Sequence, residues 1–273
     1  MMDSQTLLAE IAAPGPSDAL SIWWLGQMGF IIKSGSSVIV IDAFLSEHPR
    51  REIPPPLKPS ELQDATLFIG THDHKDHIDR DAWSEMSEAA PAAPFVIPRA
   101  VLSRLEEALP ALSSRYVGMN DGEQIQISDV TLSAVASAHE FLDCDEASGL
   151  YPYLGFIIEV NGFRLYHPGD TCLYNGLENR LLDLGPYDLM ILPINGRDAL
   201  RYSTGYLGCM TYQEAADLAG TLSPRVVIPG HYDMFKHNGE NPLLFMEYVA
   251  AKYPKQQVHL ASHGVKYSLR RSS

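Results

Sequence analysis

The chain has 273 residues, 45% of them apolar and 20% charged, and this composition excludes an intrinsically disordered or fibrous protein. The length fits one large α/β or layered domain, so we expect a single domain over residues 1–273. The 20 basic and 34 acidic side chains give a formal net charge of −14, which disfavours a nucleic-acid or membrane partner.

Cysteine usage and hydropathy indicate where the protein works. The three cysteines are too few and too scattered for a disulfide framework, which fits a reducing compartment. The first residues lack the basic segment of a signal peptide, and no run reaches the roughly 18 apolar residues of a membrane span. We therefore expect a soluble cytoplasmic protein.

The first predicted elements are strands. Apolar runs at residues 22–32 and 38–41 flank the turn-forming segment 34–37 and predict a β-hairpin. Five prolines within residues 47–59 exclude regular structure there and predict a surface flap. The apolar run 66–70 then predicts a strand that leads directly into a histidine-rich segment.

Helices and strands alternate through the rest of the chain. Helices are expected at 80–89 and 98–114, after Thr211 with its capping-box partner Glu214, and after Asn241 with a proline at the first helical position. Further strands are expected at 130–135, 154–160, 163–166, 189–192 and 226–228. Because strands occur in both halves, we predict an α/β fold of two sheets between helical layers.

The segment 71–79 reads Thr-His-Asp-His-Lys-Asp-His-Ile-Asp and follows a predicted strand. Imidazole and carboxylate are the donors that suit zinc, manganese and iron. His72 and His74 are candidates for one ion, and Asp76 and His77 for a second. A solvated polar turn is the alternative, which the specific His-x-His-x-Asp-His spacing disfavours.

This spacing resembles the signature of the metallo-β-lactamase superfamily, whose fold is a four-layer αβ/βα sandwich of two mixed sheets flanked by helices. The resemblance implies three further metal ligands: His139 after a strand, Asp170 in a Gly-Asp-Thr turn as the bridge, and His231 after a late strand. Glu140 is an alternative oxygen ligand to His139. Asp42 resembles a position that accepts a hydrogen bond from a metal-bound histidine, with a simple turn residue as the alternative.

Four segments resemble the L-ascorbate-6-phosphate lactonase-like (UlaG-like) group, namely residues 23–26, 71–74, 166–170 and 226–231. That resemblance implies two divalent ions, manganese or zinc, and a homo-oligomer. The chain is shorter than those lactonases before the histidine motif, which leaves the substrate open. Arg197, after a predicted strand, is the candidate contact for an anionic substrate, and a surface ion pair is its alternative.

The implied ligand set predicts a metal-dependent hydrolase that opens a sugar-acid lactone, such as L-ascorbate 6-phosphate, by attack of a metal-bound hydroxide. Asp76 and His77 are the expected catalytic residues, and the expected substrate is a small anionic molecule. The alternatives are a phosphodiesterase or nuclease on the same dinuclear site, an iron-dependent oxidoreductase, and a metal-binding module without activity.

Overall fold

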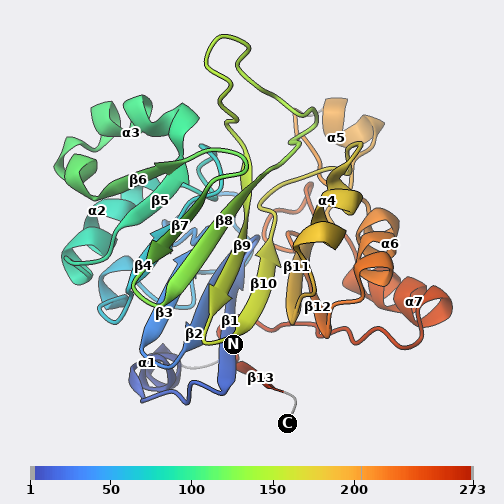
Figure 1. Ribbon diagram of the computed structural model, residues 1–273, viewed down its shortest axis with the longest axis horizontal. Helices are drawn as coiled ribbons and strands as arrows, with labels where there is room; N and C mark the ends of the chain where they lie inside the picture. Colours follow the sequence, from blue (N-terminus) through green and yellow to red (C-terminus); the bar gives the residue numbers. More distant parts are fainter. Residues whose placement is uncertain (1–3, 204, 272–273) are drawn as a thin grey trace.

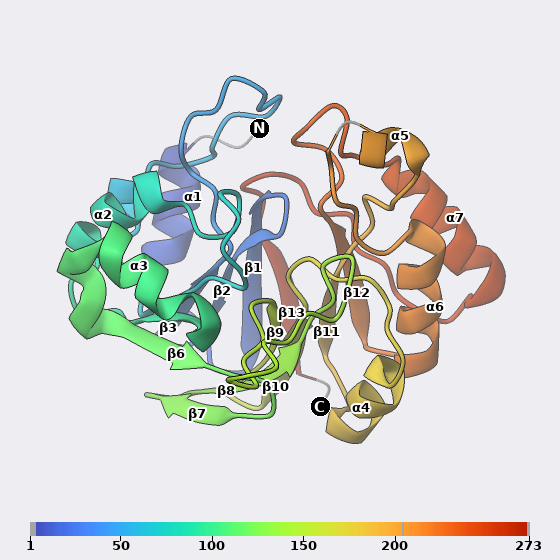
Figure 2. The same ribbon diagram turned by 90° about the horizontal axis from the view of Figure 1, so that it is seen from above.

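A computed structural model describes residues 4–203 and 205–271. Two β-sheets pack face to face, and helices cover the outer face of each sheet, which produces the predicted four-layer sandwich (Figure 1). Seen from above, α1 to α3 lie on one side of the paired sheets and α4 to α7 on the other (Figure 2).

The first sheet has seven strands in the order β13-β1-β2-β3-β4-β5-β6. Their bounds are β1 Ala19–Gly26, β2 Gly29–Ser34, β3 Ser37–Ile41, β4 Leu67–Ile69, β5 Phe95–Pro98, β6 Tyr116–Met119 and β13 Tyr267–Arg270. The pairs from β13 to β3 are antiparallel, and those from β3 to β6 are parallel. The carboxyl ends of β3 and β4 therefore lie side by side.

The second sheet has six strands in the order β12-β11-β10-β9-β8-β7. Their bounds are β7 Gln124–Ile127, β8 Val130–Ala136, β9 Leu154–Val160, β10 Phe163–His167, β11 Leu189–Pro193 and β12 Val226–Gly230. β10, β11 and β12 are mutually parallel, and β8 runs in the same direction as β10 because both are antiparallel to β9. The carboxyl ends of β8, β10 and β12 therefore share one edge.

Helices of moderate length cover these sheets. They are α1 Ser4–Ala12, α2 Arg80–Ala89, α3 Leu102–Ala108, α4 Leu177–Leu184, α5 Ala199–Ser203, α6 Tyr212–Leu222 and α7 Pro242–Lys252, with 3₁₀ turns at Pro59–Glu61, Arg99–Val101 and Pro110–Arg115. Among the described residues, none of these helices is long and apolar enough to cross a membrane.

Two apolar cores hold the layers together. Because successive side chains of a strand point to opposite faces, Trp24 enters the core between the sheets, and its neighbour Trp23 enters the core under α1 to α3. Both indole rings are almost fully buried. β1 is consequently apolar on both faces, as expected for a strand covered from both sides.

Most predicted elements are confirmed. The strands expected at 66–70, 130–135, 154–160, 163–166, 189–192 and 226–228 are β4, β8, β9, β10, β11 and β12. The proline-rich flap has no regular structure before Pro59. The helix caps at Thr211 and Asn241 are both made by side chains that accept backbone N–H groups.

Two predicted elements were wrong in detail. The run at 22–32 is two strands, because the chain turns at Gly26 and Gln27, both with positive φ, so β1 to β3 form a three-stranded meander. The stretch at 98–114 is not one helix. Pro110 cannot continue the α-helical hydrogen bonds, so α3 ends at Ala108 and a 3₁₀ turn follows.

Candidate metal centre

The loop between β4 and α2 is fixed at the end next to α2. The side chain of Asp79 caps α2 by accepting from the backbone N–H of Ala82. The same carboxylate accepts from the backbone N–H groups of Leu45 and Ser46, at 2.9 and 2.7 Å. These bonds tie the histidine-rich loop to the segment after β3, so the loop carries its side chains in a defined arrangement.

The structure brings all seven predicted ligands together at the shared strand edge. Two groups of three have donor atoms within 4.8 Å of one another: His72, His74 and His139, and Asp76, His77 and His231. Asp170 joins them, with its Oδ2 3.6 Å from His139 Nε2 and 3.1 Å from His231 Nε2. A carboxylate between two donor groups has the position that a bridging ligand needs.

Several ligand atoms in the described part of the chain lack a hydrogen-bond partner or face another ligand nitrogen, an arrangement that suits binding of a divalent cation. Among the described residues, His77 Nε2, His139 Nδ1 and Asp170 Oδ1 are buried without a hydrogen-bond partner, and His77 Nε2 lies 3.3 Å from Asp170 Oδ1. His72 Nε2 and His74 Nδ1 face each other at 3.0 Å. Buried polar atoms normally have partners, and a cation among these nitrogen and oxygen donors would supply one.

Electrostatics prepare these side chains for metal binding. Burial lowers the pKa of His72 well below its usual range and that of His139 to about 4, so both rings are neutral at physiological pH, the form that binds metal. Burial opposes ionisation of Asp170, but His231 and His77 hold the pKa of this carboxyl well below its usual range. Burial opposes protonation of His77 and His231, but Asp170 raises the pKa of both imidazoles. His72 and His139 thus offer neutral imidazoles, whereas His77 and His231 release a proton when a cation binds.

Asp42 orients one of these histidines. The Nδ1–H of His77 donates to Asp42 Oδ2 at 2.7 Å, and both side chains are fully buried. Thr71 fixes the same carboxylate with its backbone N–H at 2.8 Å and its hydroxyl at 2.7 Å. Because Nδ1 of His77 is bound to Asp42, its Nε2 faces the cluster. This is the hydrogen-bonding role that the resemblance implies for Asp42.

Gln27 is a residue of the centre that sequence reasoning missed. It is fully buried at the turn between β1 and β2, with a φ of 50°. Its Nε2 donates to Asp76 Oδ2 at 3.1 Å and lies 3.2 Å from His231 Nε2. The backbone carbonyl of Gln27 accepts from the backbone N–H of His231 at 3.0 Å. The sequence offered one signal for this role, because Gln27 is a polar residue inside the apolar run 22–32.

The structure does not bring Arg197 into this centre. Its guanidinium binds the Glu214 carboxylate through two 2.7 Å contacts and donates to the Cys209 carbonyl at 3.0 Å. Arg197 therefore forms an ion pair, which is the predicted alternative to substrate binding. Cys209 itself was not predicted, and it lies within 4.8 Å of donor atoms of Asp170 and His231. Glu140 belongs to none of the candidate metal groups among the described residues.

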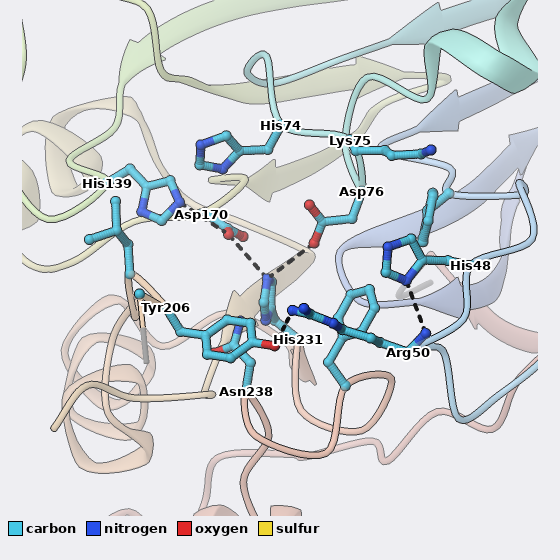
Figure 3. Close-up of a pocket in the computed structure, with 14 residues that line it drawn as sticks. His48, Arg50, His74, Lys75, Asp76, His139, Asp170, Tyr206, His231 and Asn238 are labelled. Carbon is cyan, nitrogen blue, oxygen red and sulfur yellow. Dashed lines mark hydrogen bonds and ion pairs between the residues drawn. The ribbon is translucent and has the colours of Figure 1, made fainter. Parts of the chain in front are cut away.

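A pocket of about 310 Å³ opens over the cluster (Figure 3). Its floor includes His74, Asp76, His139, Asp170 and His231, and its walls are Phe44, His48, Arg50, Lys75, Gly205, Tyr206, Leu207, Phe235 and Asn238. The walls come from the segment after β3, the loop after β4, the loop after α5 and the loop after β12. This size admits a small molecule.

Comparison with known families identifies the fold. A family model described as the β-lactamase superfamily domain matches residues 38–232. The chain belongs to the metallo-β-lactamase superfamily. The matched segment runs from β3 to the residue after His231 and so contains every predicted ligand of this superfamily.

Relatives within the superfamily are named UPF0173 metal-dependent hydrolases. Those of Thermococcus onnurineus and Pyrococcus abyssi are 32% and 30% identical over 233 and 234 residues, in each case 85% of this chain and 93% of the relative. Igni18, a metallo hydrolase from Ignicoccus hospitalis, shares the fold with a TM-score of 0.71 at 21% identity, over 93% of this chain and all of that chain. The lactonase-like subgroup stays a prediction.

Proposed function

We propose that this superfamily member hydrolyses a carboxylic ester bond in a small anionic molecule, with a sugar-acid lactone such as L-ascorbate 6-phosphate as the preferred class. The position of Asp170 between two groups of three donors carries the proposal. The relatives' names, which describe metal-dependent hydrolases, support the reaction class.

The residues that would hold two divalent ions, manganese or zinc, are His72, His74, His139 and Asp76, His77, His231, with Asp170 shared between them. Bound there, such ions would lower the pKa of a water toward about 7 and would polarise a carbonyl group. His72 and His139 supply neutral donors, and Asp42 keeps His77 aligned.

Asp76 is suited to orient the attacking water. Its side chain is 22% exposed and lines the pocket, whereas the other ligand carboxylate, Asp170, is 4% exposed. Burial opposes ionisation of Asp76, but His77 and His231 lower the pKa of its carboxyl, so it is an anion at neutral pH. An ionised carboxylate accepts a hydrogen bond from the water, and Gln27 holds it in place from behind.

A comparison of substrates tests the proposal. Manganese- and zinc-loaded protein is assayed in one buffer on L-ascorbate 6-phosphate, on unphosphorylated sugar-acid lactones and on bis(p-nitrophenyl) phosphate. We expect the lactones to be preferred, and Asp170→Asn to lose at least about 100-fold in kcat because the shared carboxylate is gone. Preference for the phosphodiester would replace lactone opening with phosphoryl-ester hydrolysis on the same fold.

A further inference from the structure

Among the described residues that line the pocket, one guanidinium, that of Arg50, has no carboxylate partner. Arg50 and Lys75 both line the pocket, but Lys75 Nζ is bound to Asp81 Oδ2 at 2.6 Å. Within residues 4–203 and 205–271, the side-chain contact of Arg50 is with a neutral group, the hydroxyl of Tyr206, at 3.4 Å. Arg197, the other candidate for an anion, is already bound to Glu214.

The flap holds the backbone of the exposed residue Arg50 in place. The backbone N–H of Arg50 donates to His48 Nδ1 at 3.2 Å, and the His48 ring packs on Phe235 with centroids 5.7 Å apart. The next residue, Arg51, donates to the Phe44 carbonyl at 2.6 Å and lies 5.0 Å over the Phe44 ring. Arg51 thus anchors the flap, which leaves Arg50 directed toward the pocket.

Arg50 spans the mouth of the pocket. Figure 3 shows its side chain extending from the flap toward Tyr206, which belongs to the loop after α5. A phenol oxygen at 3.4 Å is a long and neutral partner for a guanidinium, whose planar fork matches a carboxylate or phosphate with two parallel hydrogen bonds. An oxyanion can therefore replace Tyr206 with a gain in hydrogen bonding.

We infer that Arg50 recognises an oxyanion substituent, a carboxylate or a phosphate, on the substrate. The body of the substrate then lies against Phe44, Leu207 and Phe235, and its ester carbonyl reaches the cluster below. The inference rests on the proposed function for the ester, but the subsite itself is defined by binding. The oxyanion of the substrate is thus bound by the flap and not by Arg197 in the loop after β11.

A binding experiment tests the subsite without requiring turnover. Phenylphosphonate, benzoate and the neutral benzamide are titrated calorimetrically into manganese-loaded wild type, Arg50→Met and Arg50→Lys. Arg99→Met is the matched control, because Arg99 pairs with Glu123 outside the pocket. We expect Arg50→Met to weaken phenylphosphonate binding about tenfold, Arg50→Lys to weaken it less, and Arg99→Met to leave it unchanged.

The probes distinguish the possible anions. A loss for phenylphosphonate alone indicates a phosphate on the substrate, a loss for benzoate alone indicates a carboxylate, and a loss for both indicates either group. Benzamide binding should be equal in wild type and Arg50→Met. Equal binding of both anions to these two proteins would overturn the inference. If Arg50 controls anion binding and no ester is hydrolysed, the proposed function fails and the subsite remains.

Discussion

At the scale of single residues, the centre depends on side chains that hold the ligands as well as on the ligands. Asp42 and Thr71 fix His77, while Gln27 contacts Asp76 and His231 from the turn between β1 and β2. Such supporting contacts set the orientation of a ligand and its affinity for metal. They are therefore open to test by conservative substitution.

Gln27→Ala should weaken the centre while the fold persists. Loss of the amide that donates to Asp76 is expected to lower manganese affinity or kcat by about 10- to 100-fold, with little change in KM. Metal affinity is measured by calorimetry and kcat on the best lactone. Gln124→Ala is the control, since Gln124 is exposed on β7 and bonds Ser133. Unchanged affinity and unchanged kcat would contradict the role of Gln27.

Arg197→Met tests whether Arg197 is structural. Burial opposes ionisation of Glu214, but the hydrogen bonds from Arg197 lower the pKa of this carboxyl. The pair therefore stabilises the fold above the unfolded carboxyl pKa of about 4.3, and this stability is lost as the pH falls through the lower folded pKa. We expect the variant to lose about 1 kcal/mol of unfolding free energy at pH 7.

The loss of unfolding free energy in Arg197→Met should be much smaller at pH 3 than at pH 7. Urea denaturation at both pH values measures this loss. An equal loss at the two pH values would show that packing, and not the ion pair, is what Arg197 contributes. Because Arg197 lies outside the described pocket lining, the variant should retain the wild-type KM.

At the scale of elements, the centre forms where loops from both sheets meet. The turn after β10 touches the loop after β4 at Gly169, whose φ is +62°. A Cβ at this position would lie 2.5 Å from Thr71 Oγ1, the hydroxyl that donates to Asp42. A side chain there would therefore disturb the support of His77 from the opposite sheet.

Gly169→Ala should destabilise the protein by more than its backbone strain alone. We expect a loss of about 2–3 kcal/mol in urea unfolding and weaker manganese binding, because strain and overpacking add. Gly149→Ala is a matched control, since Gly149 has a φ of +69° and nothing within 4 Å of its Cβ position. Equal losses in the two variants would mean that the contact with Thr71 is unimportant.

Element-level patterns explain which features the sequence could predict. His72 to His77 are neighbours in the chain, and Asp170 and His231 follow apolar strands, so the resemblance to the superfamily's ligand order identified them. Gln27 and Asp76 are 49 residues apart, and their contact depends on how β1 packs beside the loop after β4. The direction of Arg50 depends on the flap, whose prolines predict only the absence of regular structure.

At the scale of the whole molecule, the chain is acidic, yet two cationic side chains, Arg50 and Lys75, line the pocket over the ligand cluster. The net charge of −14 disfavours polymeric anions, and the pocket of about 310 Å³ fits a small ligand. Arg50 can therefore provide the local attraction for an anionic substrate that the overall charge does not.

The most direct test of the account is the rate of lactone hydrolysis as manganese or zinc is titrated into chelator-treated protein, with binding followed in parallel. Without metal, both wild type and Asp170→Asn should show negligible activity. As metal is added, the rate should rise with bound metal in wild type and stay negligible in Asp170→Asn. Equal rates before and after metal addition, or full metal binding without hydrolysis of any lactone or ester, would contradict a metal-dependent ester hydrolase.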